Sequence, residues 1–349
     1  MTRTWLTAAG VLGLTVVAGV LHYGGSTPVV VFVVSGGALG GVAWVIGIGT
    51  ESVGARFGPA VTGSLQSTLG NLPELFIVVF ALRAGETVVA QFSILGSLFA
   101  NALLVLGLAI AAGAATAKDG VMRFASRLPN DTATLMLLAV FLIAVLGLSD
   151  QVGDRASAHQ VEISVVGAIC LLVVYGAWLV GYLRSDTPAE PSEHAHLALP
   201  FVPALGLLGG AGVAAALVSD WFVEAIDPAV RSIGISKAFT GLVIVAIAGN
   251  AVENVVAIQL AVKQKTDLAI SVVKNSVAQI ACFLFPLLVL VSLLFDHRLT
   301  FVIDPIFLGA LALTALAVWQ ITGDGEAVLF EGMALVALYV VLATLVWFE

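Results

Sequence analysis

The sequence predicts an all-α polytopic membrane protein with about eleven transmembrane helices, and three observations support this fold class. Of the 349 residues, 60% are hydrophobic and 10% are charged, and the mean hydropathy is +1.10. Apolar stretches long enough to cross a bilayer follow one another along nearly the whole chain, and one polar motif occurs twice among them. Since a helix needs roughly 20 apolar residues to cross about 30 Å of hydrocarbon, this composition excludes a soluble globular protein.

Apolar runs separated by polar segments place the predicted spans. These are 5–22, 28–49, 58–83, 88–114, 132–149, 161–183, 199–219, 235–261, 268–294, 302–321 and 328–348. The first run follows Arg3 and ends without an A-x-A cleavage site, so we expect a retained helix rather than a secretory signal. The third run is polar before its motif, and we include it because a helix inside a bundle does not meet lipid on every face.

The polar motif occupies the middle of the third and eighth predicted spans, as GNLPELF at 70–76 and GNAVENV at 249–255. Three residues of the first stretch recur 179 positions later: Gly70, Asn71 and Glu74 correspond to Gly249, Asn250 and Glu253. A charged side chain at the bilayer centre is costly, by about 2.5 to 3.5 kcal/mol on insertion scales. Two such acids therefore need partners, water, protons or a cation.

A polar, acidic segment with several prolines, SDTPAEPSEHAHLALP, separates the sixth span from the seventh. The predicted organisation is an N-terminal transmembrane helix at 1–27, a first five-helix repeat at 28–184, an acidic linker at 185–198 and a second five-helix repeat at 199–349. Because five is odd, the second repeat enters the membrane from the opposite side, which makes the two repeats inverted. The two motifs are then expected to face each other near the bilayer centre.

The distribution of Lys and Arg favours a cytoplasmic N-terminus, which puts the C-terminus on the opposite side. With that topology the inner loops hold eight basic residues, Arg3, Arg56, Lys118, Arg123, Arg127, Arg184, Lys263 and Lys265. The outer loops hold five, Arg83, Arg155, Arg231, Lys237 and Arg298. We expect an integral protein of the cell (plasma) membrane whose partner is the lipid bilayer, with no nucleic acid bound; a homo-oligomer is left open.

The repeated motif supplies the oxygen ligands that a hard cation such as calcium prefers. Carboxylates and side-chain amides contribute directly, and glycine in a helix frees backbone carbonyls. We predict a shared metal site built from Glu74, Glu253, Asn71, Asn250, Gly70 and Gly249. The alternative is a buried structural acid held by a hydroxyl or an amide, and recurrence of the acid in the same frame of an inverted half argues against it.

Polar residues also open the helix after each motif, on the fourth and ninth spans. Ser97 and Ser276 are again 179 positions apart. Together with Gln91, Asn101 and Gln279, these hydroxyls are candidates to line a cavity or to take part in gating. The alternative is hydrogen bonding between helices, which small and polar residues commonly provide in membrane bundles.

Several motifs together carry a family resemblance: GNLPEL, ALRAGE, VAQFSILGSLFANALLVLG, GLVIVAIAGNAVEN, AVKQKTDLA, NSVAQIACFLFP and DGEAVLFEG. They resemble the two alpha repeats and the C-terminal signature of the calcium/proton exchanger branch of the calcium/cation antiporter superfamily, over nearly the whole chain. The resemblance implies an eleven-helix fold in which Glu74 and Glu253 are the central ion-binding acids. It also implies proton-coupled calcium efflux, with calcium and protons as transported substrates and no cofactor.

Three departures from the family pattern bear on cation selectivity. Asn254 stands where the family usually has a histidine after the second motif glutamate, and Lys274 with Asn275 stand where a small apolar residue and a glycine usually precede the serine. If Lys274 points inward, its charge weakens calcium binding or stands in for a transported ion. If its stem extends toward the inner surface, it does neither.

Charge balance gives a mechanism for exchange. Two carboxylates are neutralised either by one divalent cation or by two protons, and since these occupants compete for the same oxygens, loading one expels the other. Rocking of the helices around the site would alternate its exposure. Alternatives are a sodium-coupled or broader-specificity antiporter for manganese, sodium or potassium, a cation channel, and an intramembrane hydrolase, although a hydrolase needs two different acid roles rather than equivalent halves.

Overall fold

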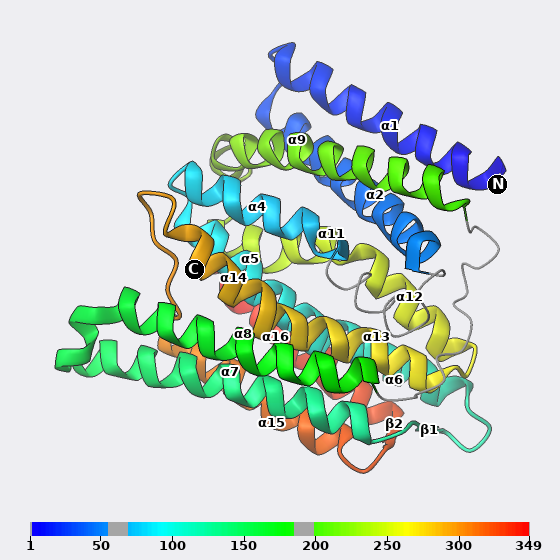
Figure 1. The fold of residues 1–349 in the computed structure, drawn as a ribbon, viewed down its shortest axis with the longest axis vertical. Helices are drawn as coiled ribbons and strands as arrows, with labels where there is room; N and C mark the ends of the chain where they lie inside the picture. The colour runs from blue at the N-terminus through cyan, green and yellow to red at the C-terminus, as the bar shows by residue number, and fades with distance from the viewer. Residues whose placement is uncertain (1, 55–68, 185–198, 349) are drawn as a thin grey trace. The chain divides into compact units, whose positions relative to one another are not determined.

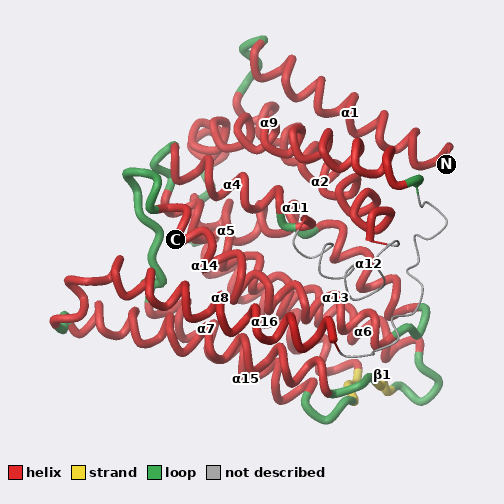
Figure 2. Tube along the Cα trace, viewed as in Figure 1, coloured by secondary structure: helices red, strands yellow, loops and turns green. Residues whose placement is uncertain are grey.

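The structure is a computed structural model that describes residues 2–54, 69–184 and 199–348. Within these ranges the side chains of residues 2, 3, 51, 127–129, 182–184 and 251–253 are not described. Nearly all described residues are helical, and the strands form a single short pair at one end of the helices (Figure 2). The helical class predicted from the sequence is confirmed.

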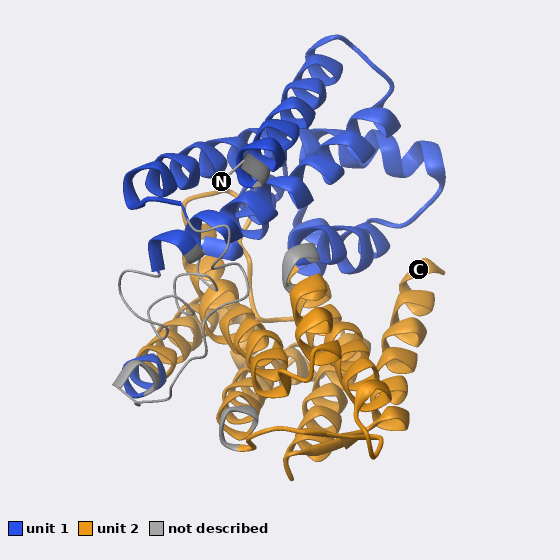
Figure 3. Ribbon diagram, turned by 90° about the vertical axis from the view of Figure 1, so that its right-hand side faces the viewer, with its two compact units in different colours: residues 1–93, 177–252 blue, residues 94–176, 253–349 orange. Residues whose placement is uncertain are grey.

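The chain divides into two compact units, coloured separately in Figure 3. Unit 1 comprises 1–93 and 177–252, and unit 2 comprises 94–176 and 253–349. Each unit therefore takes segments from both predicted repeats. The division of the sequence at 1–27, 28–184, 185–198 and 199–349 remains a prediction about its repeats, and the linker at 185–198 lies outside the described residues.

Unit 1 contains the first helices of each half (Figure 1). They are α1 (Thr2–Tyr23), α2 (Pro28–Gly54), α4 (Leu72–Arg83), α9 (Phe201–Ile233), α10 (Lys237–Phe239), the π-helical η4 (Thr240–Val245) and α11 (Ala246–Gly249). Helix α5 (Thr87–Phe99) and helix α8 (Gln160–Arg184) each run through a unit boundary.

Unit 2 contains the later helices of each half and the strand pair. Its elements are η1 (Ala100–Val105), α6 (Leu106–Thr116), β1 (Val121–Arg123), α7 (Arg127–Val152), η2 (Arg155–His159), most of α12 (Ala251–Val262), α13 (Thr266–Gln279), η5 (Ile280–Leu284), α14 (Phe285–Ser292), α15 (Pro305–Thr322), β2 (Glu326–Val328) and α16 (Leu329–Trp347). The segments η1 and η5 are π-helical, and η2 is a 3₁₀ turn.

The described residues contain nine helical stretches long and apolar enough to cross a membrane, and a tenth if one bent pair counts as a span. That pair is the eighth predicted span, bent by 57° between Lys237–Gly249 and Asn254–Val262. Most of the polar part of the third predicted span, residues 58–68, lies outside the described residues, and α4 by itself has 12 residues. The predicted count of eleven is therefore neither reached nor contradicted.

Helices α2 and α9 pack side by side in unit 1, and α4 and α1 both pack against this pair. Val42, Val45 and Ile46 of α2 meet Ala211 and Ala215 of α9 in a buried apolar cluster. Small residues at such positions let two helix axes approach closely, which favours association in a bilayer where apolar burial alone does not drive it. Helices α4 and α11, which adjoin the two motifs, both contact this pair.

An ion-pair group joins three segments at one end of unit 1. Lys237 Nζ lies 2.8 and 2.7 Å from the two carboxylate oxygens of Glu86 and 2.8 Å from Asp227 Oδ1. Arg231 pairs with the other oxygen of Asp227 at 2.8 Å. Glu86 follows α4, Asp227 lies on α9 and Lys237 begins α10, so the group ties these segments together.

In unit 2 the backbones of α6 and α16 touch at two glycines. A Cβ atom added to Gly332 would lie 2.5 Å from Gly107 O, and one added to Gly107 would lie 2.6 Å from Gly332 O. Only residues without a side chain permit this approach, which explains the glycine at both positions. Helix α7 packs against α15 and α13 in the same unit.

The strands β1 and β2 pair antiparallel, with Val121 opposite Val328 and Arg123 opposite Glu326. Arg123 donates to Asp119 at 2.6 Å and to Glu326 at 3.2 Å. The hydrogen bond from Arg123 holds the pKa of the Asp119 carboxyl below its ordinary value. The strand pair thereby connects the loop after α6 with the loop before α16.

Candidate functional site: a broken helix at each repeated motif

Each repeated motif coincides with a break in a helix. Asn71 has φ −84° and ψ 6° and lies between the helical residue Gly70 and α4, while Asn250 has φ −98° and ψ 13° and lies between α11 and α12. Pro73 in the first turn of α4 has no N–H to donate, so it is compatible with a helix start but not with a continuous helix. The break lies at the same residue of both repeats.

The Glu74 carboxylate meets the second motif inside unit 1. Its side chain is 3% exposed, and Oε1 accepts a hydrogen bond from Asn250 Nδ2 at 2.5 Å. The same nitrogen donates to Ala246 O at 2.9 Å. Glu74 of the first repeat and Ala246 and Asn250 of the second therefore form one buried hydrogen-bonded group. Glu74 and Asn250 are 176 positions apart in the chain.

Gly249 leaves the space that the Glu74 carboxylate occupies. A Cβ atom at 249 would lie 2.9 Å from Glu74 Cγ and 3.1 Å from Glu74 Oε1. The acid thus lies directly against the backbone of α11 because the residue before the break has no side chain. The predicted site residues Glu74, Asn250 and Gly249 are brought together, and Asn71 is buried one helical turn before Glu74.

The Asn250 amide presents its nitrogen, not its oxygen, to Glu74. Asn250 Nδ2 donates to two oxygens, Glu74 Oε1 and Ala246 O. Its two hydrogens therefore occupy the space beside these oxygens that a bound cation would take. For Asn250 to serve as the predicted oxygen ligand, its amide has to rotate.

The second predicted acid, Glu253, lies in α12, but its side chain is outside the described part of the structure. Its neighbour Asn254 is partly buried, and Asn254 Oδ1 has no hydrogen-bond partner among the described residues. Among the described residues no three His, Cys, Asp or Glu side chains converge as a metal-binding group. The first motif acid is thus placed by contacts, and the second by its position in the helix.

The predicted accessory residues divide between the units. Gln91 lies in unit 1 and is half-buried, while the other four are buried in unit 2: Ser97, Asn101, Ser276 and Gln279. Asn101 Nδ2 donates to Ser97 O at 3.0 Å, and Gln279 hydrogen-bonds Tyr175. Part of this polar set therefore serves hydrogen bonding within and between helices, which was the alternative to a cavity lining.

Lys274 is 2% exposed, so its ammonium does not extend to the surface of the protein. Of the two orientations considered from the sequence, the structure therefore has the buried one. Lys274 Nζ and Asn275 Oδ1 have no hydrogen-bond partner among the described residues. Both residues lie in α13, within the membrane-spanning stretch Thr266–Ser292.

The described residues include three π-helical segments, which sequence analysis did not predict. η1 begins at Ala100 and η5 at Ile280, which are almost one repeat length apart, and η4 directly precedes α11. π-helical turns are rare and are frequently found at functional sites. No residue type predicts a π turn. Such a turn forms where one extra residue has to be accommodated in a helix whose packing before and after that residue is already determined.

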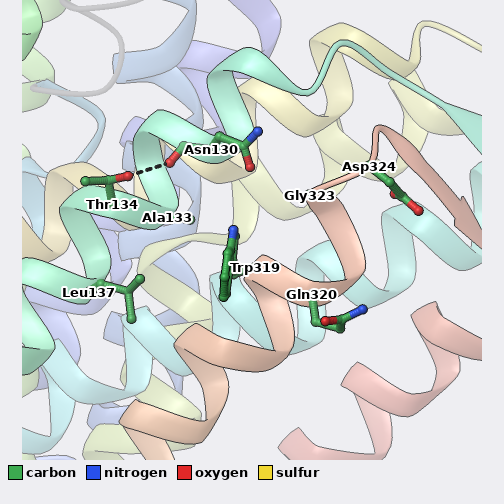
Figure 4. A pocket seen from close by; sticks show the side chains of 8 residues that line it. All are labelled: Asn130, Ala133, Thr134, Leu137, Trp319, Gln320, Gly323 and Asp324. Atoms are coloured by element: carbon green, nitrogen blue, oxygen red, sulfur yellow. Dashed lines mark hydrogen bonds between the residues drawn. The ribbon is translucent and has the colours of Figure 1, made fainter.

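A pocket of about 570 Å³ lies elsewhere in unit 2, between α7 and α15 (Figure 4). Its lining residues are Asn130, Ala133, Thr134, Leu137, Trp319, Gln320, Gly323 and Asp324. Thr134 Oγ1 donates to Asn130 O at 3.0 Å along one wall. None of the predicted site residues lines it, so this pocket is distinct from the repeated motifs.

Comparison with known proteins matches nearly the whole chain. A family model described as sodium/calcium exchanger protein matches residues 27–183 and 203–348. The Ca²⁺/H⁺ antiporter ChaA of Bacillus subtilis (strain 168) is 31% identical over 345 residues, with 97% of this chain and 96% of that protein covered. The Ca²⁺/H⁺ antiporter of Aphanothece halophytica is 30% identical over 330 residues, with 88% and 87% covered.

Solved structures share the fold. The structure of native YfkE matches with a TM-score of 0.80 and 29% identity, covering 99% of this chain and 100% of that one. The crystal structure of the H⁺/Ca²⁺ exchanger CAX matches with a TM-score of 0.76, covering 97% and 88%. Identity to the latter is 15%, so that likeness shows the fold alone.

Proposed function

Since the chain belongs to the sodium/calcium exchanger protein family, we propose that it is a secondary transporter that exchanges calcium ions for protons across a membrane. Two relatives of at least 30% identity over most of the chain are named Ca²⁺/H⁺ antiporters. The family consists of transporters rather than enzymes, which sets the intramembrane hydrolase aside. Nine described helices long and apolar enough to cross a membrane accord with this assignment.

The observation that carries the proposal is the contact of Glu74 with Gly249 and Asn250. It joins an acid of one motif to the break in the other motif, in the buried interior of unit 1. A buried carboxylate beside a helix break has both a charge to neutralise and nearby backbone carbonyls that lack helical partners. Such a place suits a cation or a proton as an alternating occupant.

In the proposed cycle, the carboxylates of Glu74 and Glu253 bind either one calcium ion or two protons. Competition for the same oxygens couples the two flows, because a bound calcium ion excludes the protons and the reverse. Asn71, Asn250 and backbone carbonyls near Gly70 and Gly249 complete the oxygen set. Alternating exposure of the loaded site to the two sides converts a proton gradient into calcium transport.

Sodium coupling is the second candidate. The family resemblance leads us to expect a histidine where this chain has Asn254, and Lys274 is a buried basic residue of unit 2. Both residues bear on which ion is exchanged for calcium. A sodium gradient at equal pH on both sides should drive no calcium uptake under the first proposal and should drive it under the second.

The proposed location is the plasma membrane, with the N-terminus cytoplasmic and the C-terminus on the opposite side. The excess of Lys and Arg in the assigned inner loops supports this orientation. An impermeant thiol reagent applied to intact cells tests it. With both native cysteines replaced, a cysteine added after Glu349 should be labelled, and one added before Thr2 should be protected.

Uptake of radioactive calcium into proteoliposomes tests the proposed exchange. An imposed pH gradient should drive calcium uptake by the wild type, and Glu74→Gln and Glu253→Gln should each abolish it, since a neutral amide cannot alternate between a proton and a cation. Glu162→Gln is the matched control, because that carboxylate is 71% exposed in the first turn of α8. Uptake that persists in either motif variant would defeat the assignment.

A further inference from the structure

The pocket between α7 and α15 lies where two membrane-spanning stretches of unit 2 reach the water. One stretch begins at Asn130 and the other ends at Thr322, and residues next to both positions line the pocket. Leu137, which also lines it, lies about 10 Å further along α7 at 1.5 Å per residue. The pocket volume of about 570 Å³ is in the range typical of small-molecule sites, about 300 to 1,000 Å³. The pocket therefore reaches from the headgroup region into the hydrocarbon region of a bilayer.

The lining of the pocket changes from polar to apolar in the same direction. Asn130 and Asp324 lie at the end next to the water, and Leu137 lies at the deeper end. The Trp319 indole stands between them, with its nitrogen directed toward Asn130 (Figure 4). Tryptophan is enriched at this level of membrane proteins because one part of its ring system is apolar and the other donates a hydrogen bond. A ligand that fits this lining has a polar end and an apolar end.

Below the pocket, both helices continue with exposed apolar side chains. On α7 these are Leu137, Phe141 and Val145, whose spacing of four residues places them along one face of the helix. On α15, Leu313 and Leu316 are exposed. Within a membrane span such side chains meet lipid tails. An acyl chain that leaves the pocket would therefore continue along a surface that lipid already covers.

The polar end favours a headgroup that carries both an ammonium and a phosphate group. Asp324 is the one charged residue among the described residues of the lining, and its side chain is exposed. Asp324 Oδ1 accepts a hydrogen bond from Glu326 N at 3.0 Å, which leaves the other carboxylate oxygen for an ammonium group. Trp319 Nε1 and the amide nitrogens of Asn130 and Gln320 are donors for phosphate oxygens. A net-anionic headgroup would be repelled by the carboxylate, and a choline headgroup has no N–H to donate to it.

We propose that this pocket binds a membrane phospholipid whose headgroup carries a primary ammonium group, as in phosphatidylethanolamine. The ammonium group donates to Asp324, the phosphate group accepts from Trp319 and Asn130, and an acyl chain lies over Leu137. The bound lipid would join α7 to α15 at the end of the two spans. This site is separate from the repeated motifs, so it does not depend on which ions the protein exchanges.

Fluorescence quenching in liposomes tests the proposal. Lipids with brominated acyl chains quench a nearby tryptophan, and the difference in quenching between the wild type and Trp319→Phe gives the contribution of Trp319. The bilayers are phosphatidylcholine with brominated phosphatidylethanolamine, phosphatidylcholine or phosphatidylglycerol added at the same mole fractions. Since exposed ion pairs are weak, we expect half-maximal quenching at a roughly two- to fivefold lower mole fraction of the ethanolamine lipid than of the choline lipid. The glycerol lipid should show no such preference.

Asp324→Asn should abolish the preference, because it removes the charge and keeps the oxygen that accepts from Glu326 N. Trp347 at the end of α16 is the matched control, since it is 51% exposed and Trp319 is 52% exposed. The difference between the wild type and Trp347→Phe should show equal quenching by all three lipids. Equal quenching at Trp319, a preference for the glycerol lipid, or an ethanolamine preference that persists in Asp324→Asn would overturn the proposal.

A second measurement does not depend on Trp319→Phe being folded. Phosphatidylethanolamine that remains bound to the full chain after detergent extraction should exceed its share of the bulk lipid, and Asp324→Asn should remove this excess. Glu162→Gln should retain it, because that carboxylate is exposed on α8. A wild type without the excess, or an equal loss in both variants, would show contact with bulk lipid only and would likewise overturn the proposal.

Discussion

Asn250 donates a hydrogen bond to the Glu74 carboxylate at 2.5 Å, and the two residues belong to opposite copies of the repeated motif. The amide nitrogen also bonds Ala246 O, so its orientation is fixed by two oxygens rather than one. A donor in this position stabilises the acid when no cation is bound. Replacement of that donor by calcium would require the amide to present its oxygen instead.

Removing the amide should weaken calcium binding. In Asn250→Leu the Glu74 carboxylate loses its donor and the site loses an oxygen ligand, and partners of this kind typically contribute 10- to 100-fold to metal affinity. We expect a roughly 10- to 100-fold higher calcium KM in proteoliposome uptake. Gln320→Leu is the control, since Gln320 is exposed on α15; an equal effect there would show that lost polarity alone accounts for the change.

A methyl group at 249 should displace the Glu74 carboxylate. In Gly249→Ala the added Cβ would lie 2.9 Å from Glu74 Cγ, so the side chain or α11 has to move. Overpacking of this kind usually costs about 1 to 3 kcal/mol, and we expect loss of proton-driven calcium uptake together with a lower unfolding temperature. Gly209→Ala on α9 meets nothing within 4 Å and should leave both unchanged. Normal uptake by Gly249→Ala would contradict the role of this glycine.

The sequence predicted the helical class and the meeting of the two motifs because both depend on simple patterns. Apolar stretches of membrane length define spans, and an odd number of spans per repeat inverts the second repeat. Glycine, asparagine and proline within an apolar run predicted a loosened helix, and breaks lie at Asn71 and Asn250. The binding role of the motif residues stays a prediction.

Features that depend on packing could not be predicted in this way. Sequence analysis assigned the Asn250 oxygen to a bound cation, and in the structure the amide nitrogen faces Glu74; an amide offers both groups, and packing decides which one a neighbour meets. Helix α9 continues to Ile233, well beyond the predicted span end at 219, because its acidic residues find partners: Glu224 lies 3.4 Å from His22, and Asp227 pairs with Lys237. The burial of Lys274 was likewise open, because a lysine stem can reach either an interior acid or the surface.

The contact between α6 and α16 should be a stability determinant without a direct part in transport. In Gly332→Ala the new Cβ would lie 2.5 Å from Gly107 O and 2.6 Å from Ala111 N, both backbone atoms that cannot rotate away. We expect destabilisation by about 1 to 3 kcal/mol, measured as a lower unfolding temperature in detergent. Gly309→Ala on α15 has open space around it and serves as the control. Equal unfolding temperatures of the two variants would mean that α6 and α16 can move apart without a loss of stability.

The ion-pair group at Lys237 should stabilise the start of the eighth span in a salt-dependent way. Partly exposed pairs of this kind usually contribute about 0.2 to 1 kcal/mol each, and Lys237 contacts two carboxylates, Glu86 and Asp227. A double-mutant cycle of Lys237→Met and Glu86→Gln, read by thermal unfolding, should give a coupling energy of up to about 1 kcal/mol. Because salt screens exposed charges, the coupling should shrink at 1 M salt. Zero coupling at low salt would show that the two side chains meet without stabilising the junction of α4, α9 and α10.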